Sequence, residues 1–312
     1  MTDSCHANDV TIIVCTRNRA DALRSCLASI SVAIAHTPKA LVEVVVVNNG
    51  STDHTGNVIE EWKRSAPCSI RVVDQLKPGL GAARNGGVKQ AQGKYIAFTD
   101  DDCRLAPDYL NRMLAHFEND GRPAIRGGMV KLGDPTDLPT AIKERPEQLV
   151  LTYPMHPGTV ALGCNMAMSR EVFAQIGLFD ERFGAGTLLR SAEETEFFYR
   201  AFQHSIPVIY VPDMIVFHFH GRKTLESMRK QIVSYAIGTG GMAAKHAFSS
   251  TLLSRHVYWD ARAFVRDLRS GGRSSRWREA SEFTWLTGVL RGIGLFWLSS
   301  LIRRSNAKGR EA

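Results

Sequence analysis

The chain has 312 residues, of which 44% are hydrophobic and 22% charged, so it can bury a large core and is not a disordered protein. Its six cysteines include no C-x-x-C pair and match neither a zinc site nor a disulfide framework, which favours a reducing cytoplasm. The first nine residues lack the basic and apolar regions of a secretory signal, so a cytoplasmic protein is expected.

The net charge of +8 is concentrated near the end of the chain. Residues 255–312 contain 12 Lys and Arg against 5 Asp and Glu, whereas the preceding residues are nearly neutral. No nucleic-acid reader motif accompanies this basic segment, so we expect no nucleic-acid partner. An anionic membrane surface is the better candidate partner.

The first third of the chain alternates between strand and helix patterns. Apolar runs typical of buried strands begin at Val10 and Val44, and each ends in polar residues. Further elements are expected at residues 21–34 (helix), 53–64 (helix), 70–73 (strand), 82–92 (helix) and 94–98 (strand). This order predicts an α/β fold with a mostly parallel central sheet, flanked by helices, and a binding crevice at the carboxyl ends of the strands.

The rest of the chain divides into a mixed and a helical part. Expected elements are a helix at 107–117, a strand at 124–130, strands at 165–168 and 208–211, and helices from residue 169 and at 192–203. Five prolines mark residues 133–157 as a long or mobile loop, which we assign to the acceptor side. After His220 only helical periodicity remains, so we expect a domain at residues 1–220 and a helical, basic extension at residues 221–312.

Three consecutive carboxylates follow the apolar strand at residues 94–98. Like charges at a strand end repel one another, and a divalent cation with hard oxygen ligands would resolve the conflict. Asp100 and Asp102 therefore predict a site for Mn²⁺ or Mg²⁺ and a diphosphate, with a solvated acidic turn as the alternative. Alternation along an extended chain would place Asp101 on the opposite face.

Eight segments together carry a resemblance to a known family. They are CTRNR (15–19), NNGSTD (48–53), GAARN (81–85), TDDD (99–102), GCNMA (163–167), IGLFDE (176–181), AEETE (192–196) and VFHFH (216–220). In this order they make the chain similar to glycosyltransferase family 2, whose members are inverting enzymes of GT-A-type fold. The resemblance implies a nucleotide-diphospho-sugar donor, a saccharide or lipid-linked acceptor, and a divalent metal on the diphosphate.

The resemblance also implies roles for individual residues. His218 would complete the metal site of Asp100 and Asp102, with His220 in reserve. The residues implied for the nucleotide-sugar are Thr16, Arg17, Asn18, Asn48, Arg84, Asp101 and Asn165, the last of which would shape the donor-sugar pocket with Gly163. Many relatives carry Asp in place of Asn48, which leaves the identity of the base open.

An acidic cluster begins the helix expected at residues 192–203. Inverting transfer needs a carboxylate that takes the proton from the acceptor hydroxyl, and the resemblance assigns this role to Glu194 with Glu193 beside it. Like-charge repulsion from Glu193 and Glu196 would favour the protonated form of such a base. An acidic first turn that complements the helix dipole is the alternative interpretation.

Two other functions stay open, and so do two interpretations of the apolar run near the end of the chain. A sugar nucleotidyltransferase shares the α/β layout but would need a glycine-rich loop after the first strand, where residues 15–19 contain no glycine. A catalytically degenerate scaffold that binds nucleotide-sugars is kept open by Asn48 and Glu194. The apolar run at residues 283–302, interrupted by Arg291, predicts either an interfacial membrane helix or a helix packed on protein.

Overall fold

The computed structural model describes residues 8–118, 122–247, 251–269 and 281–308. The chain forms two compact units, which are not consecutive in sequence. The first comprises Met1–Pro78, Ala82–Phe179 and Phe197–Gly221, and the second Gly79–Gly81, Asp180–Glu196 and Arg222–Ala312. The first unit thus ends close to the boundary expected from the sequence. Residues 180–196, expected in the first domain, belong to the second unit.

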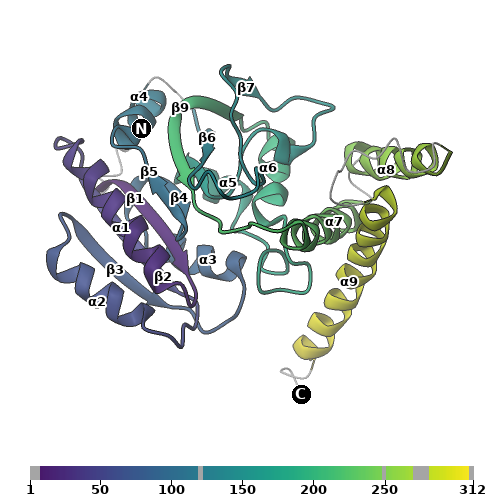
Figure 1. The fold of residues 1–312 in the computed structure, drawn as a ribbon, viewed down its shortest axis with the longest axis horizontal. Helices are drawn as coiled ribbons and strands as arrows, with labels where there is room; N and C mark the ends of the chain where they lie inside the picture. Colours follow the sequence, from purple (N-terminus) through teal and green to yellow (C-terminus); the bar gives the residue numbers. More distant parts are fainter. Residues whose placement is uncertain (1–7, 119–121, 248–250, 270–280, 309–312) are drawn as a thin grey trace. The chain divides into compact units, whose positions relative to one another are not determined.

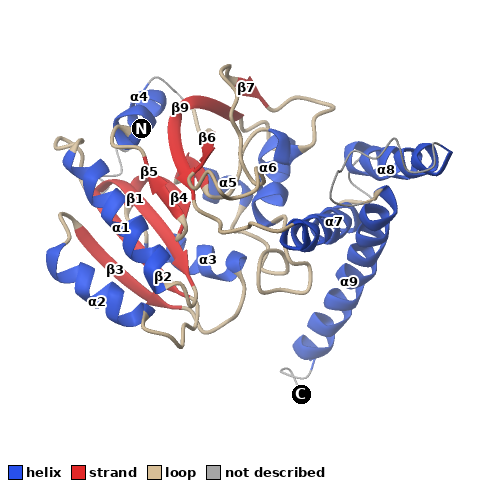
Figure 2. Ribbon diagram, in the orientation of Figure 1, coloured by secondary structure: helices blue, strands red, loops and turns tan. Residues whose placement is uncertain are grey.

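One mixed sheet organises the first unit, in which the described residues form nine strands (Figures 1 and 2). The strands are β1 (Asn8–Thr16), β2 (Val42–Asn48), β3 (Ser69–Asp74), β4 (Gly93–Asp100), β5 (Cys103–Leu105), β6 (Ile125–Leu132), β7 (Leu149–Val150), β8 (Asn165–Ser169) and β9 (Val208–His218). Their order is β3-β2-β1-β4-β8-β6-β9-β5, and β7 pairs with β9. The first four strands in this order are parallel, as expected, whereas β8 joins β4 and β6 in antiparallel fashion.

Helices cover both faces of this sheet. Apolar residues of α1 (Ala20–Ala35), α2 (Thr55–Ser65) and α4 (Tyr109–Glu118) pack with alternate residues of β1, β2 and β4 into the main core. On the other face, Gly87 of α3 (Leu80–Gln90) lies so close to Ile13 that a Cβ would come within 2.6 Å of it. Phe173 of α5 (Glu171–Ile176) packs there against Phe98 of β4 and Phe197 of α6 (Glu193–Gln203).

The segment expected as a long loop, residues 133–157, is tied to the sheet. It contains β7, and Lys143 within it forms an isolated bridge with Val130 of β6. The buried carboxylate of Asp137 accepts a hydrogen bond of 2.8 Å from the backbone N–H of Gly221. These contacts hold the segment beside the end of β9, the strand that carries His218.

Three helices dominate the second unit: α7 (Leu225–Lys245), α8 (Thr251–Arg269) and α9 (Glu282–Lys308). Glycines bring α7 and α9 into backbone contact. A Cβ on Gly240 would collide with the carbonyl of Val289, and one on Gly292 would collide with that of Ile237. The helix expected over 283–302 therefore packs on protein along one face. Among the described residues, no helix is both long and apolar enough to cross a membrane.

Candidate active site

Four parallel strands end together and bring their polar residues to one edge of the sheet. The strand register pairs Thr16 with Asn48, Asn48 with Asp74, and Cys15 with Asp100. Because the carboxyl ends of parallel strands face the same way, the loops after β1, β2 and β4 meet at this edge. The structure thus brings Thr16, Asn48 and Asp100, which belong to separate motifs, to the same edge of the sheet.

Asp101 and Asp102 share one guanidinium at this edge. Nη1 of Arg19 lies 3.1 Å from Oδ1 of Asp101 and 2.6 Å from Oδ2 of Asp102. The hydroxyl of Thr16 donates a hydrogen bond of 2.8 Å to the other oxygen of Asp101. The expected alternation of the acids is wrong beyond Asp100, because the chain leaves the strand there and turns at Asp101 and Asp102.

His218 meets the opposite side of the Asp102 carboxylate. Its Nε2 lies 3.3 Å from Oδ1 of Asp102, and its Nδ1 lies 3.2 Å from the carbonyl of Ala141. The backbone N–H of Phe219 donates to the carbonyl of Asp102 at 2.8 Å, which fixes the two segments to each other. His220, the reserve candidate, lies 3.5 Å from the carboxylate of Asp137, and its ring centroid is 5.1 Å from that of His218.

The charges of this cluster reinforce one another in the buried environment. Burial opposes ionisation of Asp102, but the hydrogen bond with His218 and the charge of Arg19 hold its pKa well below the usual range. Burial also opposes the charged form of His218 and lowers its pKa, yet the hydrogen bond and the charge of Asp102 raise that pKa to about 9. For Asp101, burial outweighs the effect of Arg19 and raises the pKa to about 6. Of these two carboxylates, Asp102 is therefore the one that stays ionised well below neutral pH.

Arg84 is placed behind the acidic cluster and not on the surface. Its side chain is 2% exposed, and its guanidinium lies 5.7 Å from the ring centroid of Phe179. One terminal nitrogen reaches Oδ1 of Asp100 at 3.4 Å. Gly163 covers the guanidinium so closely that a Cβ would come within 2.6 Å of it. Arg84 therefore contributes a buried positive charge next to Asp100.

Asn48 holds the turn that follows β2. Its Oδ1 accepts a hydrogen bond of 3.0 Å from the backbone N–H of Ser51, and its Nδ2 donates to Oδ1 of Asp74 at 3.3 Å. Because an amide offers both a donor and an acceptor, it satisfies these two partners at once. An Asp at this position would place a second carboxylate against Asp74.

Asn18 connects the loop after β1 to the loop after β2. Its Oδ1 accepts from the backbone N–H of Thr52 at 2.7 Å, and its own N–H donates to Oγ of Ser51 at 3.0 Å. Its φ of 54° lies in the left-handed region that Asn tolerates. The neighbouring Arg17 is exposed on the same loop.

Asn165 lies in the core of the first unit. It is fully buried, and its Oδ1 accepts from the Tyr109 hydroxyl at 3.0 Å. Its Nδ2 donates to the carbonyls of Met129 and Met214, both at 2.9 Å. The amide therefore links α4 to strands of the core, and a part for Asn165 in shaping the donor-sugar pocket stays a prediction.

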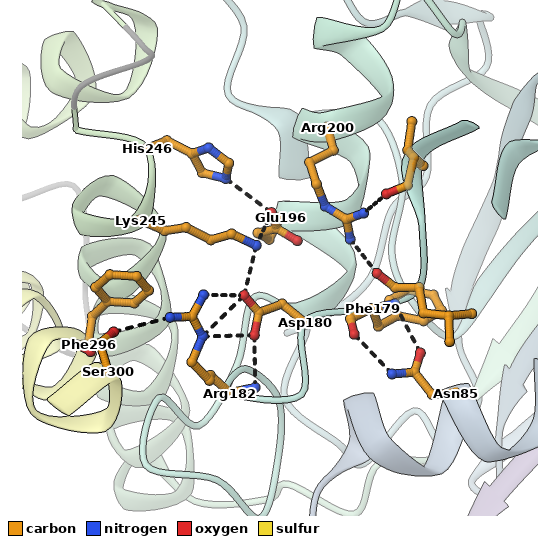
Figure 3. Close-up of polar contacts among 12 residues, drawn as sticks. Asn85, Phe179, Asp180, Arg182, Glu196, Arg200, Lys245, His246, Phe296 and Ser300 are labelled. Atoms are coloured by element: carbon orange, nitrogen blue, oxygen red, sulfur yellow. Dashed lines mark hydrogen bonds and ion pairs between the residues drawn. The ribbon is translucent and has the colours of Figure 1, made fainter. Parts of the chain in front are cut away.

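The acidic turn that begins α6 belongs to the second unit (Figure 3). Glu193 is buried and Glu194 is half-buried, with the Thr195 hydroxyl 3.3 Å from its Oε1. Glu196 is fully buried, and Lys245 and His246 reach it at 2.7 and 3.0 Å. The charge of Lys245 thus offsets the repulsion that the sequence led us to expect from Glu196.

Asp180 extends this network of charges within the second unit (Figure 3). Nη2 of Arg182 lies 2.6 Å from its Oδ2, and Nζ of Lys245 lies 2.7 Å from the same oxygen. Although burial opposes ionisation, these two cations hold the pKa of Asp180 well below its usual range. Lys245 therefore joins Asp180 to Glu196 and fixes the start of α6 to the end of α7.

The first unit contains a group of side chains suited to a divalent cation. A carboxylate oxygen of Asp102, Sγ of Cys103 and a ring nitrogen of His218 all lie within 4.8 Å of one another. Hydrogen bonding of Nδ1 to the Ala141 carbonyl leaves Nε2 facing this group, as is common for histidines that bind metals. The chemistry of these donors fits a metal ion.

Two residues of the cluster were not assigned from the sequence. Arg19 lies in the first of the family-like segments, but only the structure shows its pairing with Asp101 and Asp102. The sequence did offer a signal for this pairing. Arg19 follows the first strand, and Asp101 and Asp102 follow the strand that lies beside it in the sheet. Cys103 was given no role from the sequence, although it directly follows Asp102.

Comparison with known proteins gives consistent matches. The sequence profile of the family described as Glycosyl transferase family 2 matches residues 11–177. The chain is 34% identical over 105 residues to putative glycosyltransferase EpsH of Bacillus subtilis, which covers 34% of this chain and 29% of that protein. It is 26% identical over 179 residues to glycosyltransferase AglE of Haloferax volcanii, covering 57% and 58%. The matched part is thus less than two thirds of either relative.

Solved structures resemble the chain over most of its length. A mannosyltransferase of Pyrobaculum calidifontis in complex with GDP-Man and Mn²⁺ matches with a TM-score of 0.59 at 18% identity, over 92% of this chain and 87% of that chain. TarS 1-349 of S. aureus in complex with UDP-GlcNAc matches with a TM-score of 0.52 at 16% identity, over 90% of both chains. These likenesses confirm the predicted fold of GT-A type.

Proposed function

Because the chain belongs to glycosyl transferase family 2, we propose that it transfers a sugar from a nucleotide-diphospho-sugar to an acceptor hydroxyl with inversion. One observation carries the proposal: Asp101, Asp102, Arg19 and His218 converge where the parallel strands end. This is the edge at which open α/β sheets bind their ligands. The acceptor that we propose is a glycan or a lipid-linked saccharide.

The donor's diphosphate needs positive charge, and we propose Mn²⁺ or Mg²⁺ as its main source. Asp102 and His218 would hold the cation, with Asp100 two residues earlier, at the end of β4, as a further ligand. Such a cation neutralises the charge that develops on a leaving diphosphate. Arg19 would then exchange its carboxylate partners for phosphate oxygens, since a guanidinium binds both kinds of oxyanion. Arg84 supplies a further buried positive charge near Asp100.

For the proton transfer we propose Glu194 as the general base. The acceptor hydroxyl must lose its proton as its oxygen attacks the anomeric carbon, and a carboxylate can take that proton. Glu194 is the less buried of the adjacent pair, so it can reach a ligand more readily. Glu193 is buried, with its Oε2 3.0 Å from where a Cβ on Gly184 would lie, which suits a positioning role.

The identity of the nucleotide base rests on the loops around Asn48. The solved neighbours bind different donors, GDP-Man in one and UDP-GlcNAc in the other. The amide of Asn48 is engaged by Ser51 and Asp74, so we propose that it shapes the base pocket through the turn that it holds. Thr16, Arg17 and Asn18 would line the same pocket from the loop that follows β1.

A donor screen tests the proposed function. Uridine, guanosine and thymidine diphospho-sugars are added with Mn²⁺, and both the melting temperature and the release of nucleoside diphosphate are measured. We expect one base to stabilise the protein and its sugar derivative to be hydrolysed or transferred. Stabilisation without turnover would favour a degenerate scaffold. Pyrophosphate release from a nucleoside triphosphate and a sugar phosphate would favour a nucleotidyltransferase.

We also propose that the second unit holds the enzyme on an anionic membrane. The exposed face of α8 carries four arginines between aromatic and apolar side chains. Its members are Arg255, Tyr258, Trp259, Arg262, Val265, Arg266 and Arg269. The guanidinium of Arg262 lies 5.2 Å from the ring centroid of Trp259, so basic and aromatic groups share one surface. Such a face suits the interface of an anionic bilayer.

The side of α9 opposite Gly288 and Gly292 adds an apolar stripe. The large apolar residues exposed on it are Phe283, Leu290, Trp297, Leu298 and Leu301. They recur at spacings of three, four and seven residues, which places them on one helical face. Arg291 lies exposed within this stripe. We propose that both helices rest on lipid, which would bring a lipid-linked acceptor to the enzyme in two dimensions.

A further inference from the structure

The cluster around Asp102 contains a thiol that a site for hard cations does not need. Mn²⁺ and Mg²⁺ prefer oxygen ligands, and thiolate sulfur is a ligand of softer ions. Cys103 nevertheless directly follows Asp102, with its Sγ 3.9 Å from the Asp102 Oδ1 atom that also faces His218. The carboxylate, the thiol and the imidazole lie within 4.8 Å of one another.

The backbone fixes this arrangement. Cys103 and His218 are direct partners in the antiparallel pairing of β5 with β9, so their side chains start from adjacent positions. The residues that follow Cys103 and His218 add a restraint, because the guanidinium of Arg104 lies 4.0 Å from the ring centroid of Phe219. The N–H of Phe219 is bonded to the carbonyl of Asp102. The three donors are therefore held in place before any ion arrives.

The surroundings suit a bound metal ion in two more ways. Nδ1 of His218 faces a carbonyl, which can only accept a hydrogen bond, so the proton lies on Nδ1 when Nε2 binds a metal. The three donors are also buried, with Asp102, Cys103 and His218 between 1% and 8% exposed. Oδ2 of Asp102 is engaged by Arg19, which leaves Oδ1 for the ion.

We propose that Asp102, Cys103 and His218 form a three-ligand site for a thiophilic divalent cation of the Zn²⁺ class. One carboxylate, one thiolate and one imidazole match the donors that Zn²⁺ takes in proteins, and three protein ligands leave a fourth position open. Binding converts the thiol to a metal thiolate and releases its proton to solvent. The inference rests on the proposed function only in sharing Asp102 and His218 with the proposed Mn²⁺ or Mg²⁺ site.

The site has a consequence for the proposed reaction. An ion held by Asp102 and His218 occupies the place of the hard cation, so Zn²⁺ competes with Mn²⁺ for the donor site. Cys103 then determines the metal preference of the enzyme. Replacing Cys103 by Ser should lower the affinity for Zn²⁺ by roughly tenfold or more and leave the affinity for Mn²⁺ within a few fold.

Cobalt spectroscopy of the full chain tests this site directly. The protein is freed of metal with a chelator and titrated with Co²⁺, and the near-ultraviolet thiolate-to-cobalt absorption is recorded. We expect this band in the wild type, its loss on adding Zn²⁺, and its absence in Cys103→Ser. The control is Cys68→Ser, because Cys68 precedes β3 at the opposite end of the sheet; this variant should keep the band. A band that persists in Cys103→Ser would overturn the proposal.

X-ray absorption of the Zn²⁺-loaded wild type gives a result that needs no variant. At least one sulfur at about 2.3 Å from zinc is expected, and none would refute the site. Stabilisation by Mn²⁺ and nucleoside diphosphate is measured in parallel. If that stabilisation occurs without a thiolate band, the thiophilic site fails and the proposed function stands. If the band occurs without nucleotide binding, the proposed function fails and the thiophilic site stands.

Discussion

Arg19 forms an ion pair with the carboxylate of Asp102, which is far more buried than Arg19 itself. The side chain of Asp102 is 8% exposed and that of Arg19 is 46% exposed, yet the two approach to 2.6 Å. A buried charge needs a partner, whereas a half-exposed guanidinium can leave for water or for another anion. Arg19 is thus the replaceable partner of Asp102, and His218 is the buried one.

Removal of Arg19 should make the protein depend on divalent cations. In Arg19→Gln, Asp101 and Asp102 lose their shared guanidinium, so their mutual repulsion is less compensated. We expect a lower melting temperature without added metal and a larger rise on adding Mn²⁺ than in the wild type. Arg17→Gln, on the exposed neighbouring residue, is the matched control. An unchanged melting temperature and metal response would contradict the prediction.

Substitution of Asp102 should abolish binding of metal and diphosphate. Asp102→Asn removes the carboxylate that faces His218, so the Mn²⁺-dependent stabilisation by nucleoside diphosphate should disappear. Asp101→Asn should be milder, because the carboxylate of Asp101 is held by Thr16 and Arg19, whereas that of Asp102 faces His218. Thermal unfolding with and without both ligands measures the effect, and circular dichroism checks the fold. Equal metal responses in Asp102→Asn and wild type would refute the assignment.

Substitution of Glu194 should affect turnover and spare donor binding. Glu194→Gln removes the proposed proton acceptor, and loss of a general base commonly lowers the rate by about a hundredfold or more. Donor affinity should stay unchanged, as measured by calorimetry. Glu193→Gln is the comparison variant and should be less severe. If Glu194→Gln is active and Glu193→Gln is inactive, then Glu193 is the general base and Glu194 the positioning residue.

The metal-free protein should lose stability as the pH rises from about 6.5 to 9. His218 has a folded pKa of about 9 against 6.5 in the unfolded chain, so in this range the folded state binds more protons. Its contribution is complete below pH 6.5 and disappears as the pH passes the folded pKa. The loss is at most about 3 kcal/mol, from 1.36 kcal/mol per pKa unit. Urea unfolding with chelator at pH 6 and pH 9 measures it.

Two histidine variants make this measurement specific. His218→Gln should flatten the dependence over that range, whereas His36→Gln, which alters an exposed histidine of the first unit, should keep it. An equally steep loss of stability in His218→Gln would assign the effect to another group.

Binding to anionic vesicles should depend on the exposed faces of α8 and α9. Deleting α9 would remove the helix against which α7 packs and could unfold the second unit, so point variants are the better test. Arg262→Glu with Arg266→Glu should weaken sedimentation with anionic liposomes and reduce its salt dependence, since each basic residue near the surface contributes about 1 kcal/mol. Trp297→Ser with Leu298→Ser should weaken the part of the sedimentation that persists at high salt.

The control for the membrane prediction is Leu41→Ser, which changes an exposed apolar residue of the first unit. This variant should sediment like the wild type. Protein that ignores anionic liposomes at low salt, or a wild type that dimerises through these faces in size-exclusion chromatography, would refute the membrane surface.

Local sequence patterns predicted much of the first unit because its strands are short, apolar and stopped by polar residues. The ends of β1, β2 and β4 were recognisable for this reason, and the shared edge of a parallel sheet implies their convergence. The pattern failed where the chain departs from the strand. Asp101 and Asp102 lie in a turn, and a rule based on alternation cannot locate a turn to the residue.

Long-range partners were the information that the sequence lacked. Asn165 lies in a family-like segment, but its three hydrogen bonds come from α4, β6 and β9, which no local pattern connects to it. The two side chains that reach Glu196, those of Lys245 and His246, likewise come from about 50 positions later in the chain. The metal, the acceptor and the roles of Glu193 and Glu194 stay predictions.

The glycines between α7 and α9 have a consequence for how the second unit folds. Each glycine in a helix costs about 1 kcal/mol relative to alanine, and Gly240, Gly241, Gly288 and Gly292 all lie within these two helices. Neither helix is therefore a strong helix former by itself, and the close backbone contact at Gly240 and Gly292 is what stabilises both. We expect α7 and α9 to become protected from hydrogen exchange together, as one cooperative pair that forms only after the chain between them has been made.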